Sequence, residues 1–348
     1  MSINLDAYLP YLPSDLQSLP WRAHPLDGAL LLFERDSGLN VKLEGEETYH
    51  LAQLAPRTLL IAVTNHCNLT CHFCYRNLKS PSRWTYDSLL TFCQQADRWG
   101  VLEAAFGGGE PTIFPRWKDL ICDLYETTQL AINFTTNGML LTEDFLQTTA
   151  GKVGQIRLSL YEDNNWEDTI RLLTKTETRF GVNWLITPQE LDSIQEQFKT
   201  LLDLGVRDFL LVAYKGPDAS LHFRSTDYQK LEEFLIGAYE EMGTRISLKL
   251  DICWGHHLPN VPRLFQPQDC GAGDGFISIT SDKRIKPCSF HHLDVPFETL
   301  ADVRVWWEAR RHNRHAAQIG GCARLPDRGL TQKGELKDAV IHLAAVEQ

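Results

Sequence analysis

The sequence predicts an α/β protein built on an open, partial barrel of six parallel strands. From residue 58 onward, short apolar runs alternate with helical patterns at a spacing of roughly 25 residues. Such alternation is typical of strand–helix units that form a parallel sheet. Six units fall short of the eight that close a barrel. The motifs that carry chemistry follow directly after the expected strands, which is where parallel sheets place their sites.

The expected elements alternate regularly along the chain. The strands are short apolar runs rich in β-branched and aromatic residues, and the helices repeat apolar residues at three- and four-residue spacing. The expected strands are 59–63, 103–106, 131–135, 156–160, 182–186 and 208–212. The expected helices are 85–99, 114–127, 142–150, 166–179, 191–204 and 228–242.

Composition and charge exclude several classes of protein. The 348-residue chain is 43% hydrophobic and 23% charged, as ordinary soluble globular proteins are. No run approaches the roughly 18 apolar residues of a membrane helix, and MSINLDAYLPYLPSDL lacks a signal-peptide pattern. We therefore expect a cytoplasmic protein without a membrane partner, and the net charge of −11 argues against a nucleic-acid partner. In the cytosol the nine cysteines stay reduced, so those that cluster are expected to bind metal.

Three cysteines cluster in CNLTCHFC, residues 67–74. Cys67, Cys71 and Cys74 are spaced C-x3-C-x2-C, just after the first expected strand. Soft thiolates select zinc, copper or iron–sulfur clusters. A structural zinc site takes four protein ligands, and the nearest other cysteine, Cys93, falls inside an expected helix. Zinc is therefore the weaker alternative to an iron–sulfur cluster with one iron left open.

This motif resembles C-x3-C-x-aromatic-C, the signature of the radical S-adenosylmethionine (radical SAM) superfamily, with Phe73 as the aromatic residue. The resemblance implies a partial (β/α)6 radical SAM barrel in which the three cysteines hold a [4Fe–4S] cluster that chelates SAM. It implies a reductase or flavodoxin-type protein as the electron donor. It also implies the chemistry: SAM is cleaved to methionine and a 5′-deoxyadenosyl radical, which takes a hydrogen atom from the substrate.

Further motifs follow the next expected strands. GGGEPT, residues 107–112, resembles the segment that binds the SAM amino group; glycines let a ligand approach the backbone, and a glutamate can pair with an ammonium. The family has Ser-x-Asp where this chain has Ser159-Leu160-Tyr161, so a satisfied strand hydroxyl is the alternative role for Ser159. The residues that the resemblance implies near SAM are Phe73, Gly107, Gly108, Gly109, Glu110, Asn137 and Ser159.

The second half of the chain resembles the SPASM or Twitch extension of peptide-modifying radical SAM enzymes. A Gly-rich run CGAGDGF is followed by FISITSDKRIKPC, which is expected to form a hairpin, and later by GGCA. The full extension binds a second cluster through cysteines whose places are taken here by Gln318, His312 and Ala309. The resemblance therefore implies a shortened, Twitch-like domain with one auxiliary [4Fe–4S] cluster; scattered thiols are the alternative. Its expected ligands are Cys253, Cys270, Cys288 and Cys322.

These observations divide the chain into four segments. Residues 1–57 are a cap segment, in which LDGALLLFERDSGLNVKLEG is expected to form a hairpin that pairs with the sheet edge or roofs the barrel. Residues 58–245 are expected to form the barrel, 246–325 the Twitch-like domain and 326–348 a tail helix.

Three functions remain open. The favoured one is post-translational modification of a ribosomally synthesised precursor peptide, by crosslinking, epimerisation or backbone rearrangement. The second is a small-molecule dehydrogenase that uses the auxiliary cluster as electron acceptor. The third, an iron–sulfur sensor without SAM chemistry, is disfavoured by the glycine-rich motif beside the cysteines. Neither end of the chain has the pattern of a winged recognition module, so we expect a separate peptide-recognition protein to dock on the N-terminal hairpin or the sheet edge by strand addition.

Overall fold

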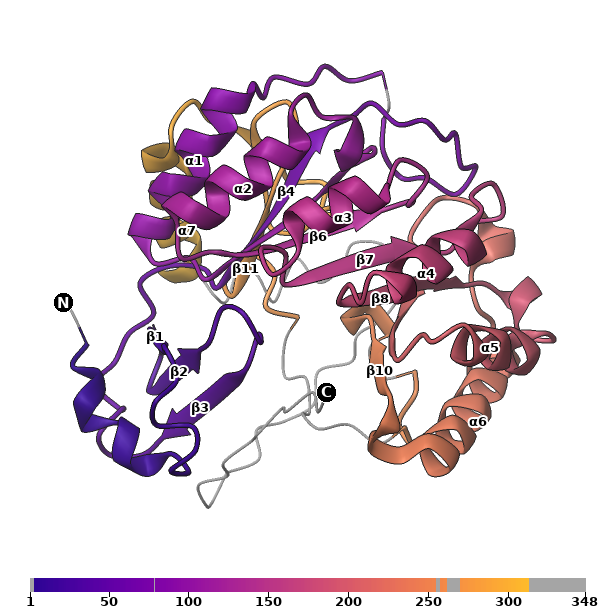
Figure 1. The fold of residues 1–348 in the computed structure, drawn as a ribbon, viewed down its shortest axis with the longest axis horizontal. Helices are drawn as coiled ribbons and strands as arrows, with labels where there is room; N and C mark the ends of the chain where they lie inside the picture. The colour runs from indigo at the N-terminus through magenta and orange to yellow at the C-terminus, as the bar shows by residue number, and fades with distance from the viewer. Residues whose placement is uncertain (1–2, 78, 255–256, 262–269, 313–348) are drawn as a thin grey trace.

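A computed structural model describes residues 3–77, 79–254, 257–261 and 270–312. Among them, a ten-stranded sheet has the order β10-β9-β8-β7-β6-β5-β4-β11-β12-β13, and a three-stranded sheet has the order β1-β2-β3. In the large sheet, neighbouring strands from β10 to β11 are parallel, and β12 and β13 add antiparallel pairs. The predicted α/β architecture is confirmed, with its helices on the outside of the curved sheet (Figure 1).

The elements agree with the sequence pattern to within a few residues. The strands are β1 (Arg22–Leu26), β2 (Ala29–Phe33), β3 (Asn40–Glu44), β4 (Thr58–Thr64), β5 (Glu103–Gly108), β6 (Ala131–Thr136), β7 (Gln155–Ser159), β8 (Phe180–Ile186), β9 (Asp208–Ala213), β10 (Ser247–Leu250), β11 (Phe276–Ile279), β12 (Arg284–Lys286) and β13 (Val295–Pro296). The helices are α1 (Tyr86–Trp99), α2 (Trp117–Thr127), α3 (Glu143–Thr149), α4 (Trp166–Lys175), α5 (Ile194–Asp203), α6 (Ser225–Met242) and α7 (Leu300–His312).

The six predicted strands are β4 to β9, and the sheet continues beyond β9 at one end and beyond β4 at the other. At one edge β10, which the pattern did not predict, pairs with β9. At the other edge β11 pairs in parallel with β4, and with β12 it forms the hairpin predicted before Cys288. The sheet therefore runs without a break from residues assigned to the barrel into residues assigned to the auxiliary region. The predicted tail, 326–348, lies outside the described residues.

Alternation along each strand separates an apolar outer face from a more polar inner face. On the outer face of β6, Ile132 and Phe134 are buried, and the Phe134 ring meets Trp117 of α2 edge-on at 5.6 Å between centroids. Such aromatic pairs add to the free energy gained by burial. The inner face carries the side chains that line the cavity described below.

One row of the inner face carries an ion pair. Arg157, Gly181 and Asp208 lie side by side on β7, β8 and β9. The Arg157 guanidinium donates to the Asp208 carboxylate at 2.6 Å, and Lys249 of β10 donates to the same carboxylate at 2.7 Å. A Cβ on Gly181 would lie 2.0 Å from Nη1 of Arg157, so glycine is required for the arginine to reach across β8.

The N-terminal residues form a sheet of their own. The predicted hairpin is confirmed as β2 and β3, with β1 added beside β2. The expectation that this hairpin pairs with the edge of the barrel sheet is wrong for the described strands, because β1, β2 and β3 form strand pairs only with one another. Apolar side chains of β2, Leu31 and Phe33, instead pack against Leu102 and Ala131 at the amino ends of β5 and β6. The small sheet therefore lies at the end of the barrel opposite the carboxyl ends of the strands.

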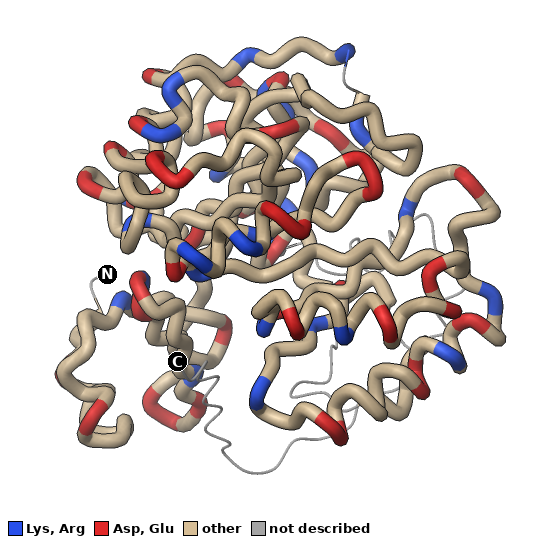
Figure 2. Tube along the Cα trace, turned by 45° about the vertical axis from the view of Figure 1, so that its right-hand side comes forward, with Lys and Arg blue, Asp and Glu red and all other residues tan. Residues whose placement is uncertain are grey.

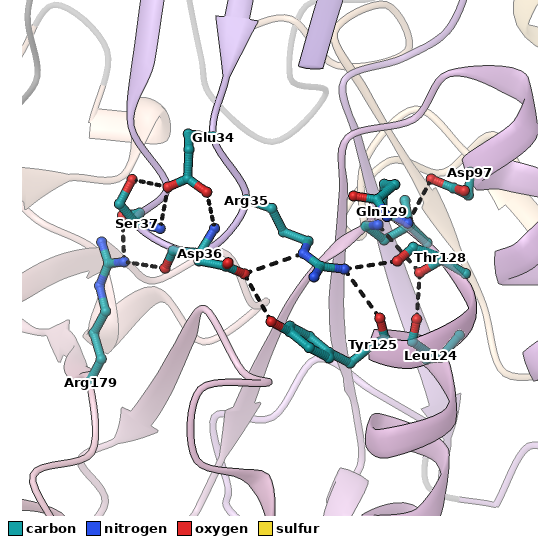
Figure 3. Close-up of polar contacts among 11 residues, drawn as sticks. Glu34, Arg35, Asp36, Ser37, Asp97, Leu124, Tyr125, Thr128, Gln129 and Arg179 are labelled. Atoms are coloured by element: carbon teal, nitrogen blue, oxygen red, sulfur yellow. Dashed lines mark hydrogen bonds and ion pairs between the residues drawn. The ribbon is translucent and has the colours of Figure 1, made fainter. Parts of the chain in front are cut away.

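Polar contacts fasten the turn between β2 and β3 to the barrel (Figure 3). The Arg35 guanidinium lies over the Tyr125 ring and donates to the carbonyl oxygens of Tyr125 and Thr128, at 3.2 and 2.8 Å. These carbonyls end α2, where a cation is favoured by the helix dipole. Arg179, just before β8, donates to the carbonyl oxygen of Ser37.

Charges are mixed over the surface. Figure 2 shows acidic and basic residues interspersed along the described chain. Some of them form ion pairs within one helix, as Arg171 and Glu167 do in α4. No helix in the described part of the chain is both long and apolar enough to cross a lipid bilayer.

Candidate active site

A cavity of about 360 Å³ opens at the carboxyl ends of the parallel strands. It is lined by residues from β4 to β9 and from the loops that follow them, together with Ser289 and Phe290 beyond β12. Every residue that the sequence placed at the SAM site borders it. These residues are Cys67, Cys71, Phe73, Cys74, Gly107, Gly108, Gly109, Glu110, Asn137 and Ser159.

The cysteine loop leaves β4 and is anchored at its start by Asn65. This buried residue receives a hydrogen bond on its side-chain oxygen from Arg76 at 3.4 Å, and its own amide and backbone donate to Ser80 and Ser82. Within the loop, the backbone N–H of Leu69 donates to Sγ of Cys67 at 3.4 Å. The loop therefore has a fixed base, while its cysteines are half-buried or exposed beside the cavity.

The thiols are held near one another in a partly desolvated place. Burial, together with the neighbouring Cys74 and Cys67 thiols, raises the pKa of Cys71 to about 11. Burial also raises the pKa of Cys67. Ionising these groups at neutral pH therefore needs a compensating positive charge, which metal ions supply. This donor set fits a metal cluster.

The sulfurs do not surround one point. Among the described residues, no group of three His, Cys, Asp or Glu side chains is arranged to hold a single metal ion. In an iron–sulfur cubane each thiolate binds a different iron, so the ligands stand apart. The arrangement is compatible with a cluster.

The three glycines of GGGE have different tasks. A Cβ on Gly109 would lie 1.9 Å from the carbonyl oxygen of His66, and one on Gly108, where φ is +135°, would lie 2.3 Å from that of Thr64. Here the backbone of the cysteine loop packs directly on the glycine run, through hydrogen bonds from Gly109 to Thr64 (2.7 Å) and from Glu110 to His66 (2.8 Å). A Cβ on Gly107 would meet nothing within 4 Å. Only Gly107 therefore has free space beside it for a ligand; at the other two, the close approach is made by the protein itself.

Glu110 is a buried link between strand ends, with 1% of its surface exposed. One carboxylate oxygen accepts from the backbone and hydroxyl of Thr112 and from the hydroxyl of Thr136, at 3.1, 2.7 and 2.7 Å. The other oxygen accepts from the backbone N–H of Asn137 at 2.8 Å. The carboxylate thus joins the end of β5 to the end of β6, a role that the sequence motif did not reveal.

Two asparagines extend this link across the site. The Asn137 amide donates to the side chain of Asn68 in the cysteine loop at 2.7 Å. Asn164, in the loop after β7, donates to the carbonyl oxygens of Asn137 at 2.6 Å and Ser159 at 2.8 Å. Sequence reasoning missed Asn164; its only signal was its place in a polar loop just beyond an expected strand.

Tyr161 and Phe73 pack together beside the cysteines. Their ring centroids lie 5.1 Å apart. Burial raises the pKa of Tyr161 to about 12. An aromatic ring therefore fills the position where the family has Asp.

Three of the predicted auxiliary cysteines, Cys253, Cys270 and Cys288, lie among the described residues. Cys253 borders a small neighbouring cavity, which also contacts Lys215. Ser289 and Phe290, directly after Cys288, form part of the main cavity wall. Cys270 is half-buried, and Cys322 lies outside the described residues, so the four-cysteine set stays a prediction.

Three of the known proteins that resemble this chain are informative. The chain is 32% identical over 109 residues to the S-adenosylmethionine-dependent nucleotide dehydratase of Thermoplasmatales archaeon (strain ISO4-H5), covering 30% of this chain and only 37% of that protein. It is 24% identical to the PqqA peptide cyclase of Gluconobacter oxydans (strain 621H), over 71% of this chain and 75% of the cyclase. The solved structure of Streptococcus suis SuiB aligns with a TM-score of 0.66 and 15% identity, over 83% of this chain and 87% of SuiB.

A family model also matches. Residues 61–165 fit the model described as the Radical SAM superfamily. This range begins in β4 and ends beyond β7, so it holds the cysteine loop, the GGGE run and the strand ends around the cavity. The part of the chain that forms the candidate site, residues 61–165, therefore matches the radical SAM superfamily.

Proposed function

We propose that this protein binds a [4Fe–4S] cluster through Cys67, Cys71 and Cys74, binds SAM in the adjoining cavity, and modifies a peptide. The observation that carries the proposal is the meeting of the three thiols with the GGGE run and Asn137 around one cavity of about 360 Å³, a size typical of ligand sites. When bound, the cluster supplies the electron that splits SAM into methionine and a 5′-deoxyadenosyl radical, which removes a hydrogen atom from the substrate.

The chain's own residues would bind SAM and keep water away from the cluster. The open space beside Gly107 would admit the amino-acid end of SAM next to the cysteine loop. Glu110 would offer its carboxylate to the ammonium while keeping its four protein donors. Phe73 and Tyr161 would keep water from the cluster side of the cavity, where a reactive radical must be protected.

A peptide substrate is supported by two of the comparisons. The PqqA peptide cyclase matches 71% of this chain, whereas the nucleotide dehydratase matches 30% of it. A further solved structure with the same fold is SuiB bound to the precursor peptide SuiA, with a TM-score of 0.63. At the cavity wall, Tyr75 and Phe290 pack at 4.3 Å between centroids, and Tyr75 is 42% exposed, so an aromatic surface is open to a side chain of the substrate.

A small-molecule substrate is the second candidate. It is favoured by the 32% identity with an enzyme that acts on nucleotides. Tandem mass spectrometry with chiral amino-acid analysis separates the two: a peptide substrate changes in mass, fragmentation pattern or stereochemistry, whereas a nucleotide substrate yields a new small molecule and leaves peptides unchanged.

The auxiliary cluster, the recognition protein and the electron donor are further parts of the proposal. Cys253 borders the same small cavity as Lys215, which also lines the main cavity. Cys288 lies two residues before Phe290, which forms part of the main cavity wall. A cluster on these cysteines would therefore lie near the substrate, as an electron acceptor requires. A recognition protein would dock on the small N-terminal sheet, whose outer strands are β1 and β3.

The decisive experiment measures 5′-deoxyadenosine formed from SAM by anaerobically reconstituted, reduced protein. We expect product from the wild type and none from the variant with Cys67, Cys71 and Cys74 replaced by Ala. Cys122→Ala is the matched control, because Cys122 is partly exposed on α2 and does not border the cavity. Equal product from the triple variant and the wild type would refute the proposal.

A further inference from the structure

One positive charge in the cavity wall has no carboxylate partner among the described residues. The side chains that border the cavity and are charged at neutral pH are Glu110, Lys215 and Arg76. Glu110 accepts four hydrogen bonds from protein groups, and Lys215 forms an ion pair with Asp251, directly after β10. The Arg76 guanidinium forms one hydrogen bond to a described residue, to the side-chain oxygen of Asn65 at 3.4 Å. The charge that is left over at the cavity wall is therefore that of one guanidinium.

The cysteine loop positions Arg76 at the cavity. Arg76 is half-buried and follows Cys74 by two residues. Its guanidinium lies 5.4 Å from the centre of the Tyr75 ring, and Asn65, which accepts its hydrogen bond, is buried at the base of the loop. A guanidinium has five N–H donors in a planar fork, which pairs with a carboxylate through two parallel hydrogen bonds. Since no described group accepts from most of these donors, they are available to an anionic ligand.

The surroundings of Arg76 point to the substrate rather than to the cofactor. The Tyr75 ring packs against Phe290, and the Lys215 ammonium lies 4.6 Å from the centre of the Phe290 ring. Lys215 and Phe290 lie outside residues 61–165, the part of the chain that matches the radical SAM model. The groups proposed to bind SAM, the glycine run and Asn137, follow β5 and β6 instead. The wall beside Arg76 is therefore built partly by residues that belong to no SAM motif.

The charge balance of this wall favours a carboxylate over a phosphate chain. A nucleoside triphosphate carries several negative charges and needs several cations to balance them. The cavity offers one guanidinium without a carboxylate partner in the described chain, because Asp251 already balances Lys215. A single carboxylate matches this charge and the planar shape of the guanidinium.

We propose that Arg76 binds a carboxylate of the peptide substrate beside the Tyr75–Phe290 pair, so that the protein selects peptides with a carboxylate near the reacting residue. The carboxylate belongs either to an acidic side chain or to the C-terminus of the peptide, and the two share the same chemistry. This inference rests on the proposed peptide-modifying function and adds the substrate class to it.

The test measures the dissociation constants of three synthetic peptides by saturation-transfer NMR, with the reconstituted protein loaded with SAM. The first is an acetylated tetrapeptide amide with one glutamate and one phenylalanine, and the second has glutamine in place of the glutamate. The third is the glutamine peptide with a free C-terminal carboxylate. We expect at least one of the two carboxylate peptides to bind about tenfold more tightly than the second, and the one that does so identifies the source of the carboxylate.

Variants of Arg76 assign this preference to its side chain. Arg76→Gln should lose the preference and bind SAM as the wild type does. Arg76→Lys, which keeps the charge without the planar fork, should keep only part of the preference. Arg207→Gln is the matched control, because the Arg207 guanidinium donates to the carbonyl oxygens of Leu202 and Val206 and does not border the cavity, so its replacement should leave the preference unchanged.

Equal binding of the three peptides to the wild type overturns the role of Arg76, and so does an undiminished preference in an Arg76→Gln variant with the iron content of the wild type. Where Arg76→Gln binds no iron, Arg76→Lys decides in its place. Weaker SAM binding by Arg76→Gln with an unchanged peptide preference assigns the guanidinium to the cofactor and also overturns the proposal. GTP serves as a fourth probe: if it binds more tightly than every peptide and loses this affinity in Arg76→Gln, the guanidinium binds phosphate instead. Absence of 5′-deoxyadenosine from the reduced wild type overturns the proposed function itself, whereas equal peptide binding with normal 5′-deoxyadenosine formation overturns only the role of Arg76.

Discussion

Replacing Gly109 by Ala should dislodge the cysteine loop. The added Cβ would lie 1.9 Å from the carbonyl oxygen of His66, against the 3.0 Å that real Cβ contacts respect, so the two backbones must separate by about 1.1 Å. That movement breaks the hydrogen bonds from Gly109 to Thr64 and from Glu110 to His66. Two lost bonds at about 1 kcal/mol each, with overpacking of about 1–3 kcal/mol, lower the free energy of unfolding by about 3–5 kcal/mol.

Gly107→Ala is the matched control, because the same methyl group there meets nothing within 4 Å. The assay pairs denaturant unfolding with the iron content after reconstitution. We expect Gly109→Ala to unfold at lower denaturant and to bind less iron. Gly107→Ala should match the wild type in both measurements and bind SAM more weakly, because its methyl group enters the cavity. Equal stability and iron content in the two variants would refute this account of the glycine run.

Three further predictions follow from single contacts. Glu110→Gln should lower both the free energy of unfolding, by about 1–3 kcal/mol, and the affinity for SAM. The reason is that the glutamine amide turns an N–H toward protein groups that are themselves donors. A variant as stable as the wild type in denaturant unfolding contradicts the linking role of Glu110. Burial lowers the pKa of His24, on β1, to about 4 from 6.5, so the unfolded chain takes up the proton first as pH falls. Stability should therefore be complete above pH 6.5 and fall by up to about 3 kcal/mol toward pH 4, a slope that His24→Leu should remove and that denaturant titrations at several pH values would reveal. In iron analysis, the protein should bind about eight irons and the Cys67, Cys71 and Cys74 triple variant about four; no iron in that variant, with about four in the wild type, would exclude the auxiliary cluster.

Local patterns were sufficient for the barrel. The strands from β4 to β9 are contiguous apolar runs whose periodicity is visible in the chain itself, and the loops after them carry the cysteines and glycines. Parallel sheets place functional residues at the carboxyl ends of their strands. This rule alone predicted that Cys67, Gly107 and Asn137 lie together, as they do around the cavity.

The contacts that hold this edge together could not be predicted in the same way. Glu110 and Asn137 are 27 residues apart, and Arg157 and Asp208 are 51 apart, so their pairing depends on strand register rather than on sequence spacing. Whether a glycine serves a ligand or a neighbouring backbone also depends on packing: Gly107 and Gly109 are indistinguishable in sequence but differ in what a Cβ would meet. The N-terminal hairpin was predictable for the same local reason as the barrel strands, whereas its place at the amino ends of β5 and β6 was not.

The polar links at the site act mainly between protein groups. Glu110 joins β5 to β6, Asn137 joins β6 to the cysteine loop, and Asn164 joins β6 to the end of β7. Each of these bonds joins two protein groups, so together they hold the cavity walls in place. Preorganisation of this kind lowers the cost of binding and keeps the reacting groups within the narrow positional tolerance that hydrogen-atom transfer demands.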